Sequence, residues 1–417
     1  MSLQDLFLEM HSHFPALEAE NCDGHILFDN AAGAQLPRMA IERVTAHLLR
    51  HNAQKGTVFA REESMQQGIY DLRAACADLM GTDSSRVALG LNATSLTALI
   101  AHQLGRDLHR GDLVLTSELD HMANIRPWEE MRTQGIRVES IPISPDGTLD
   151  LGAYQRLLTQ EPKVVACGWV SNATGTPNDL SLLAKLAHTH GALFFADCTA
   201  GAPHLLMSVE DWEIDFAVCS AYKIFGPHLG FCYINPARLG SWQLGELISQ
   251  EAGHYGYGSS YGARLELGTQ NHEGVAGFTA TLEYLAMLGT KAAQMQGTQS
   301  ANRREQLASA MNSIHQYEIE LTAALRKTIL DLPNVVLYGA PEVPIISFNL
   351  SGREPKAVAQ FLMSQKIEAR VGHFLAIPQM NRLAPSHGGE ALRVSLVHYN
   401  LPEEIERFGA AMRSFQG

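Results

Sequence analysis

Residues 216–234 read FAVCSAYKIFGPHLGFCYI, and this stretch indicates the fold class. Two apolar runs, Phe216–Cys219 and Gly230–Ile234, have the length and composition of buried strands, and Lys223 lies between them. A lysine directly after an apolar strand is a poor choice for packing, because burial disfavours its charged form. The same burial makes a neutral amine available as a nucleophile. Lys223 is therefore a candidate for chemistry.

Outward from this stretch, short apolar runs alternate with helical patterns between about residues 85 and 235. One helical pattern is Leu180–Thr189, whose apolar positions recur every three or four residues. Strands that are apolar on both faces and separated by helices predict a parallel sheet that is covered on both sides. The sequence therefore predicts a doubly wound α/β domain. The other strand-like runs are Val87–Leu91, Leu113–Leu115, Val164–Val170 and Leu193–Ala196.

The pattern changes after about Val275. A helical region, roughly residues 275–331, is followed by mixed segments that predict a small α+β domain on a long connecting helix. The first eighty or so residues are mostly helical in pattern, with Gly24–Asp29 as an extended lead into the loop Asn30–Gly33. The mixed segments are Asn334–Tyr338, Ile345–Leu350, the helix Pro355–Gln365 and Leu392–His398.

The composition limits the partners and the compartment. The chain has 417 residues and a formal net charge of -13, with 44 acidic against 31 basic side chains. Because this charge repels phosphate backbones and anionic lipid, and no basic run offsets it, we expect no nucleic-acid or membrane partner. The first residues, MSLQDLFLEMHSHF, lack the features of a signal peptide or membrane span. The six cysteines lack zinc-like spacing, so we expect no metal and a cytoplasmic location.

Polar residues follow the predicted strands. In open α/β sheets, ligands bind beyond the carboxyl ends of the strands, so these residues are expected to converge on one edge. The segment 92–95, Asn-Ala-Thr-Ser, opens a helix and suits a phosphate group. The other segments are 118–124 with His121, 171–176 with Asn172, Asp197, and 220–223 with Lys223.

Taken alone, most of these residues have an interpretation that involves no ligand. The segment 92–95 could be a plain helix cap, and Asp197 could cap the next helix. His121 could be a packed or surface histidine, and Asn172 a turn residue. Only Lys223 has no ready structural explanation.

Five segments in this order and spacing resemble the class V aminotransferases, specifically their cysteine desulfurase-like branch. They are ELDHMANIRPW (118–128), WVSNATGTPN (169–178), FADCTAGAPH (195–204), CSAYKIFGPHLG (219–230) and LELGTQNHEG (265–274). The resemblance extends from residues 28–32, FDNAA, to residues 392–395, LRVS. It implies an enzyme that depends on pyridoxal 5'-phosphate (PLP).

The resemblance also implies fold type I. Its large domain holds a doubly wound, mostly parallel seven-stranded sheet, and a smaller α+β C-terminal domain follows. The implied division gives residues 1–30 to an N-terminal segment of the small domain, and residues 31–275 to the large PLP-binding domain. Residues 276–417 then form the connecting helix and the small domain.

Residue by residue, the family roles fall on the polar positions named above. Lys223 would hold PLP as a Schiff base and move the substrate's α-proton. Asp197 would bond the protonated pyridine nitrogen, so that the ring can accept electrons. His121 would stack on the ring, and Asn172 would bond the ring hydroxyl.

The phosphate and the substrate have their own implied ligands. Thr94 and Ser220, with the backbone N–H groups of Ala93 and Thr94, would bind the phosphate, and Ser95 and Tyr222 belong to the same cofactor set. In the family a threonine of the partner subunit completes this site, and Thr269 matches it, so we expect a homodimer. Arg393 would bind the substrate α-carboxylate, a bidentate role that suits arginine. Ala31 and Arg126 complete the substrate set.

Two positions depart from the family pattern. Ala200 stands where relatives have glutamine or histidine as the companion of Asn172. In the segment 370–378, RVGHFLAIP, Leu375 stands where cysteine desulfurases carry the cysteine that accepts sulfur. Leucine has no thiolate, so an ordinary desulfurase is not expected. Cys198 is a remote substitute, because its position at a strand end indicates packing.

The expected activity is β-elimination from a sulfur-containing amino acid, a C–S lyase reaction that starts when Lys223 removes the α-proton. An aminotransferase or an amino-acid epimerase of the same fold is the alternative, and a non-catalytic scaffold is a third hypothesis. A dinucleotide-binding protein would need a glycine-rich turn where this chain has residues 92–94, Asn-Ala-Thr.

Several further residues are candidates for tuning the specificity. Arg126 could recognise a second acidic group of the substrate, or pair with a surface carboxylate. The segment Gly253–Gly262 could close over the substrate or pack at a dimer interface. The other candidates are Lys55, Arg61, Tyr255, Tyr257, Tyr261, His373 and Arg382.

Overall fold

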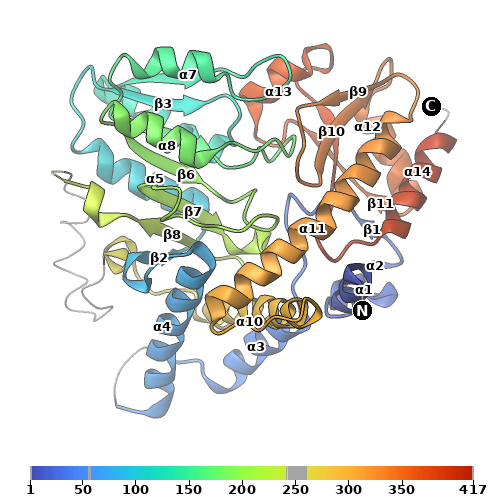
Figure 1. The fold of residues 1–417 in the computed structure, drawn as a ribbon, viewed down its shortest axis with the longest axis horizontal. Coiled ribbons are helices and arrows are strands. Elements are labelled where there is room, and N and C mark those ends of the chain that lie inside the picture. Colours follow the sequence, from blue (N-terminus) through green and yellow to red (C-terminus); the bar gives the residue numbers. More distant parts are fainter. Residues whose placement is uncertain (1, 55–57, 241, 243–260, 416–417) are drawn as a thin grey trace.

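The computed structural model describes residues 2–54, 58–240, 242 and 261–415. Figure 1 shows a large sheet with helices on both sides, and a smaller sheet beside it. The prediction of a doubly wound α/β fold with a smaller α+β part is confirmed. None of the helices in these residue ranges combines the length and the apolar character needed to cross a membrane.

The large sheet has seven strands within the described chain, in the order β2-β8-β7-β6-β5-β3-β4. Neighbouring strands are parallel, except that β8 is antiparallel to both β2 and β7. Every predicted run forms a strand, but β4 is not among the predictions, because only part of it is buried, as at a sheet edge. The strands are β2 (Val87–Gly90), β3 (Leu113–Ser117), β4 (Arg137–Ile141), β5 (Val164–Gly168), β6 (Leu193–Asp197), β7 (Phe216–Ser220) and β8 (Gly230–Ile234).

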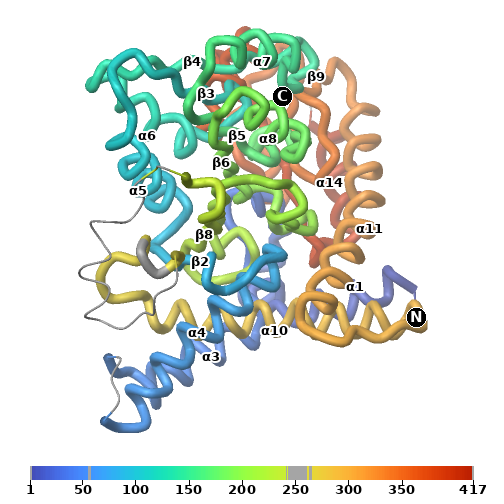
Figure 2. The backbone as a smooth tube through the Cα atoms, turned by 60° about the vertical axis from the view of Figure 1, so that its left-hand side comes forward, coloured from blue at the N-terminus to red at the C-terminus, as the bar shows by residue number. Residues whose placement is uncertain are grey.

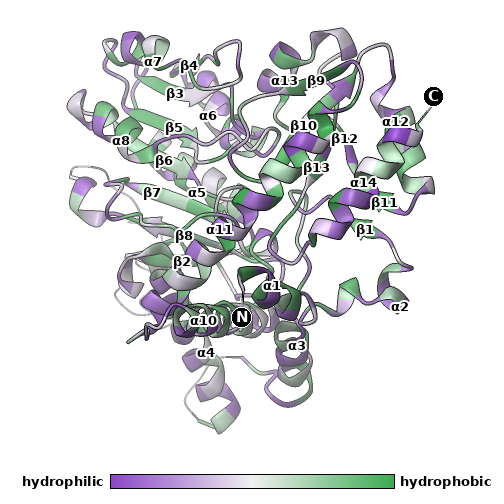
Figure 3. Cartoon of the chain, turned by 45° about the vertical axis from the view of Figure 1, so that its right-hand side comes forward, coloured by the Kyte–Doolittle hydropathy of each residue, from purple (hydrophilic) through white to green (hydrophobic). Residues whose placement is uncertain are grey.

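Side chains of the central strands alternate between two cores. Val165 and Cys167 of β5 lie in the core that α7 (Leu151–Leu158) and α8 (Leu180–Thr189) also enter. Val164 and Ala166 lie in the core on the opposite face, with α5 (Ala93–Gly105). Figure 3 shows these strands in the colours of hydrophobic residues, whereas the outer helices carry hydrophilic residues as well. Burial of such a valine contributes about 1.5–3 kcal/mol, which is why these runs are apolar on both faces.

The start of helix α5 is fixed by a capping box. The Asn92 side chain accepts a hydrogen bond from the Ser95 N–H (2.8 Å), and the Ser95 hydroxyl accepts one from the Asn92 N–H (3.3 Å). A Cβ atom at Gly230 would lie 2.5 Å from the Asn92 carbonyl carbon, so strand β8 can pass here only with glycine. The helix therefore begins at Ala93, just beyond the carboxyl end of β2.

The smaller sheet is antiparallel, in the order β12-β13-β10-β9. Its strands are β9 (Val335–Tyr338), β10 (Ile345–Leu350), β12 (Arg370–Gly372) and β13 (Ala391–Ser395), and α12 (Pro355–Ser364), α13 (Ile377–Leu383) and α14 (Pro402–Ser414) accompany them. Strand β1 (Ile26–Leu27) pairs in parallel with β11 (Ile367–Glu368), which brings the N-terminal segment to this part of the chain.

The predicted single connecting helix is two helices. Helix α10 (His272–Met295) ends before Gly297, whose φ of 71° is unfavourable for other residues, and α11 (Arg303–Leu330) begins after a short loop. Figure 2 shows α10 beside α3 (Arg38–Arg50) and α4 (Ala60–Met80), and α11 rising toward the small sheet. The other α-helices of the described residues are α1 (Leu3–His11), α2 (Ala19–Cys22) and α6 (Arg126–Glu129). The domain boundaries given above stay predictions.

A buried ion pair joins α4 to the segment that precedes α10. Arg73 and Glu266 contact each other through two pairs of atoms, at 2.9 and 2.5 Å, and their side chains are 4% and 0% exposed. The Glu266 carboxylate also accepts a hydrogen bond from the Leu89 N–H of strand β2, at 2.9 Å. One carboxylate thus holds a helix, a strand and a loop together.

Replacing Arg73 by methionine leaves a buried carboxylate without its main partner. We expect Arg73→Met to lower the free energy of unfolding by about 3–5 kcal/mol. In the control Arg43→Met, which breaks the exposed pair of Arg43 and Glu283, the expected loss is below about 1 kcal/mol. Chemical denaturation followed by circular dichroism measures both, and equal losses would contradict this view.

Candidate active site

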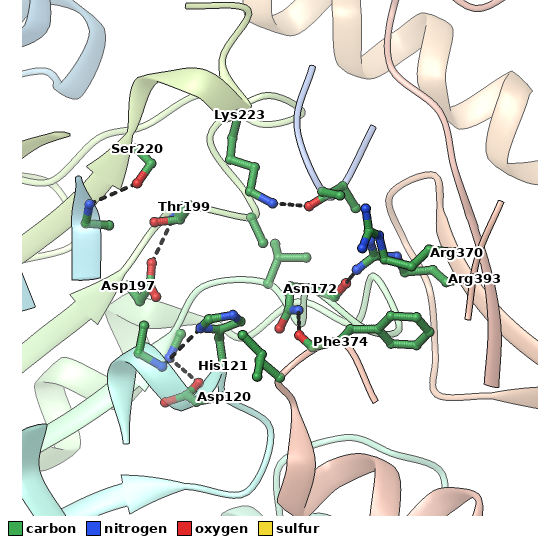
Figure 4. Close-up of a pocket in the computed structure, with 18 of the residues that line it drawn as sticks. Asp120, His121, Asn172, Asp197, Thr199, Ser220, Lys223, Arg370, Phe374 and Arg393 are labelled. Carbon is green, nitrogen blue, oxygen red and sulfur yellow. Dashed lines mark hydrogen bonds between the residues drawn. The ribbon is translucent and has the colours of Figure 1, made fainter. Parts of the chain in front are cut away.

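A cavity of about 610 Å³ lies between the carboxyl ends of the large-sheet strands and the small sheet. Figure 4 shows His121, Asp197 and Lys223 on one side of it, and Arg370, Phe374 and Arg393 on the other. Most of the predicted site residues therefore come together, although they are far apart in the sequence. Those that line the cavity are Ala31, Ala93, Thr94, His121, Asn172, Asp197, Ser220, Tyr222, Lys223 and Arg393.

One end of the cavity is formed by the N-terminus of α5. The Ala93 N–H donates a hydrogen bond to the Ser220 hydroxyl (2.9 Å), which ties the helix start to the end of β7. Thr94 is exposed beside them and lines the cavity. Unpaired N–H groups and the helix dipole favour an anion at such a helix start.

Lys223 lies in the short turn after β7, and its side chain reaches across the cavity. Its ammonium group donates a hydrogen bond to the Ala31 carbonyl oxygen (Figure 4). Burial and, to a smaller extent, the nearby positive charge of Arg393 lower the pKa of Lys223 to about 7, although Asp29 and Asp197 oppose the shift. A large fraction of this amine is therefore neutral at neutral pH.

Asp197 and His121 both line the cavity at the carboxyl ends of β6 and β3, two strands that β5 separates in the sheet. Asp197 ends β6, and its carboxylate accepts a hydrogen bond from the Thr199 N–H (2.9 Å). The His121 Nδ1 atom accepts one from the Ala123 N–H (3.0 Å), which leaves Nε2 as the protonated nitrogen of the neutral ring. Burial lowers the pKa of His121, and Asp197 partly opposes this. The ring is therefore neutral at neutral pH.

Asp120 is a wall residue to which the sequence analysis assigned no role. It is buried, and its carboxyl group accepts hydrogen bonds from the Gly168 N–H (2.6 Å) and the Asn124 amide (2.9 Å). Burial raises the pKa of Asp120 well above its usual value, although these hydrogen bonds oppose the shift. Its contacts fix the turn that carries His121. Asp120 lies two residues after Glu118 in the segment 118–124, and nothing in the sequence distinguishes the buried acidic residue from the other.

Arg393 of β13 is almost fully buried on the opposite wall. Its guanidinium donates hydrogen bonds to the Asn172 carbonyl oxygen (2.7 Å) and to the Asp29 carboxylate (3.1 Å), and lies over the Phe374 ring at 4.5 Å. Burial lowers the pKa of Arg393 to about 10, so it stays positively charged at neutral pH. Asp29 also pairs with Arg370 at 2.6 Å. The sequence reasoning missed the roles of Asp29, Arg370 and Phe374.

The comparisons with known proteins agree with this geometry. The chain matches the model of the family described as aminotransferase class-V over residues 26–310 and 305–408. It is 30% identical over 423 residues to a cysteine desulfurase of Escherichia coli O127:H6, covering 96% of this chain and 95% of that protein. The chain belongs to the class V aminotransferase family.

Solved structures of this family share the fold. A cysteine desulfurase from Thermococcus onnurineus NA1 superposes with a TM-score of 0.82 at 26% identity, covering 97% of this chain and 96% of that one. The Escherichia coli cysteine desulfurase CsdA shares the fold with a TM-score of 0.79 at 23% identity, covering 98% and 97%. This class V aminotransferase is therefore a PLP-dependent enzyme of fold type I.

No cysteine of this class V aminotransferase lines the cavity, and all six cysteines lie in the described part of the chain. Leu375 lines it instead, at the position where the resemblance places the sulfur-accepting cysteine. Cys198 is fully buried and does not line the cavity, which agrees with a packing role. Ala200 also lines the cavity, next to Thr199.

Three predicted site residues do not line the cavity. The Ser95 hydroxyl is occupied in the capping box with Asn92. The Arg126 side chain is 68% exposed and lies 3.9 Å from Glu129, so it pairs with a surface carboxylate rather than facing the cavity. Thr269 is exposed and does not line the cavity of its own chain.

The residues considered above as candidates for tuning the specificity differ in whether they line the cavity. His373 lines the cavity, while Arg382 pairs with Glu118 at 2.9 Å. Arg61 and Tyr261 are exposed and do not line the cavity. Lys55, Tyr255, Tyr257 and residues 253–260 lie outside the described residues.

The cavity wall has polar atoms that fit a bound polar group. Within the described chain, Asn172 Oδ1, Thr199 Oγ1 and Arg393 Nε are buried without a hydrogen-bond partner, and all three residues line the cavity. Leaving such an atom unpaired costs about 1–3 kcal/mol. With the helix start at one end and a partly neutral amine in the middle, these residues fit PLP and an amino acid.

The lowered pKa of Lys223 gives a test by chemical labelling. Since only the neutral amine reacts with acetic anhydride, acetylation of Lys223 in the cofactor-free protein is expected to rise with pH through a midpoint of about 7. Brief labelling across a pH series, read by peptide mass spectrometry with exposed Lys327 as the internal reference, measures this. A midpoint near the ordinary lysine value of 10.5 would contradict the burial described here.

Proposed function

We infer that this enzyme is a PLP-dependent lyase that removes the β-substituent of a sulfur-containing amino acid. The observation that carries this proposal is the pairing of Lys223, Asp197, His121 and Arg393 around one cavity that no cysteine lines. Together, these four residues can bind an amino acid on the cofactor and move its α-proton. The missing thiol removes the sulfur-transfer route of the curated relatives, because only a thiolate attacks the substrate sulfur.

Different residues of the cavity would bind different parts of the cofactor. Bound PLP supplies a sink for the electrons that remain when the α-proton leaves. The phosphate would lie at the start of α5, near Ala93, Thr94 and Ser220. Asp197 would keep the ring nitrogen protonated, and the neutral His121 ring would pack against the face of the cofactor. Asn172 lines the cavity, and its Oδ1 atom, which has no partner, would bond the ring hydroxyl.

Arg393 and Lys223 would act on the substrate itself. The guanidinium keeps its charge at neutral pH and has an unpaired N–H, so it can bind the α-carboxylate. This fixes the α-carbon relative to the Lys223 amine. Because that amine has a pKa of about 7, it can accept the α-proton and later donate it near neutral pH.

Without a cysteine, the sulfur leaves with the substituent. The amino acid and one water give pyruvate, ammonia and the free sulfur group (sulfide from cysteine, a thiol from an S-substituted cysteine, a persulfide from cystine), and no sulfur stays on the protein. The unpaired cysteines of the chain fit a reducing cytoplasm, which is the location we propose.

The product of the reaction tests this proposal. With cysteine, cystine or an S-substituted cysteine, we expect pyruvate and ammonia in equal amounts, and neither from Lys223→Ala. Lys327→Ala, which removes an exposed lysine of α11, is the control and should retain the activity. A keto acid that keeps the side chain would show transamination, and a D-amino acid would show epimerisation. If protein with bound cofactor forms none of these products, the chain is a non-catalytic scaffold.

We also propose a homodimer in which each chain completes the other's cofactor site. Thr269 is exposed and three residues beyond the buried Glu266, which anchors this loop. The exposed hydroxyl is therefore available to a second chain rather than to its own cavity.

The dimer has two measurable consequences. Sedimentation should give twice the chain mass of 45.6 kDa, and Thr269→Ala should weaken the retention of PLP during dialysis by about tenfold, the effect of one lost hydrogen bond to a charged group. Thr269→Ser keeps the hydroxyl and should behave as the wild type. A monomer that retains PLP equally well would contradict the proposal.

A further inference from the structure

The loop between β12 and α13 has an unusual backbone. Phe374 and Leu375 are consecutive non-glycine residues with positive φ angles, 53° and 57°. Each such residue costs about 1 kcal/mol or more, so the surroundings must hold the loop in this form. Both residues line the cavity.

Hydrogen bonds from the cavity wall hold this loop. The Asn172 amide donates to the Phe374 carbonyl oxygen (2.8 Å), and the Met122 N–H donates to the Leu375 carbonyl oxygen (2.7 Å). Inside the loop, His373 Nδ1 accepts from the Leu375 N–H (3.1 Å). The loop is therefore a fixed wall of the cavity, tied to the neighbours of His121 and to Asn172.

The wall also supports Arg393. The Phe374 ring lies against its guanidinium at 4.5 Å. The next residue along the loop is Leu375, whose side chain is 48% exposed although it lines the cavity. An amino acid whose carboxylate is bound by Arg393 would place its side chain close to this loop.

We propose that Leu375 selects the substrate side chain, and that it favours an unbranched apolar chain over a charged one. Leu375 lines the cavity and about half of its surface is exposed, so covering the part at the cavity with methylene groups is favourable. The proposal rests on the proposed function only through the binding of an amino acid at Arg393, and it holds for elimination or transamination alike.

The charged groups on this side do not favour an anionic side chain. Arg370 is already neutralised by Asp29, through hydrogen bonds of 3.0 and 2.8 Å and an ion pair at 2.6 Å. His373 Nδ1 is occupied by the loop. Glu390, which precedes β13, lines the cavity with an exposed side chain. A second carboxylate on the substrate would therefore meet a negative charge.

The test is a binding series that does not depend on turnover. Alanine, 2-aminobutyrate, norvaline and norleucine are titrated into the holoenzyme, and the change in cofactor absorption gives the dissociation constant. We expect affinity to rise about two- to fourfold with each methylene group in the wild type, fourfold being the limit for full burial. Aspartate should bind more weakly than norvaline.

Three variants separate selection by Leu375 from a general effect on folding. In Leu375→Ala, the affinity should no longer rise as methylene groups are added to the amino acid. In Leu375→Met, it should rise with each methylene group as in the wild type. Leu330→Ala removes a leucine of similar exposure, 49%, at the end of α11, and should behave as the wild type.

Each result has a definite meaning. Equal affinities across the series, an unchanged gain in Leu375→Ala, or tighter binding of aspartate would overturn the proposal and leave the proposed function intact. No spectral response to any amino acid, from protein that holds PLP, would overturn the proposed function and this inference with it.

Discussion

The site depends on one constraint, the burial of the Lys223 amine at the end of an apolar strand. A sheet whose central strands are apolar on both faces offers the amine little water, and this lowers its pKa to about 7. The sheet order then places Asp197, from the adjacent strand β6, on the same edge. The fold that buries the lysine thus also provides the carboxylate that would face a protonated ring nitrogen.

The opposite wall of the cavity holds two positively charged arginines side by side, and its stability depends on a carboxylate that pairs with both. Arg370 and Arg393 are directly opposite in the antiparallel pair β12 and β13, where like charges destabilise a sheet. Asp29 pairs with both, and it is brought there because β1 pairs with β11 and because Asp29 bridges to Ser395. The N-terminal segment therefore supplies, through Asp29, the carboxylate that holds both arginines in this wall. Phe374 under the Arg393 guanidinium then connects this wall to the loop that carries Leu375.

Local sequence patterns predicted six of the seven described strands of the large sheet and several of the polar residues at its carboxyl edge. Lys223, Asp197 and Asn172 each follow a strongly apolar strand, so their position on the sheet edge follows from topology. Asp29, Arg370 and Phe374 could not be assigned in this way, since their contacts join segments more than two hundred residues apart. Ser95 and Arg126 do not line the cavity, because the Ser95 hydroxyl caps its helix and Arg126 pairs locally with Glu129.

The most direct test of the central claim is to locate the cofactor on the chain. The holoenzyme is reduced with borohydride and digested, and peptide mass spectrometry identifies the residue that carries the pyridoxyl group. The account predicts one modified peptide, with the added mass on Lys223, and none in protein stripped of PLP before reduction. Label spread over exposed lysines, or a site other than Lys223, would contradict it.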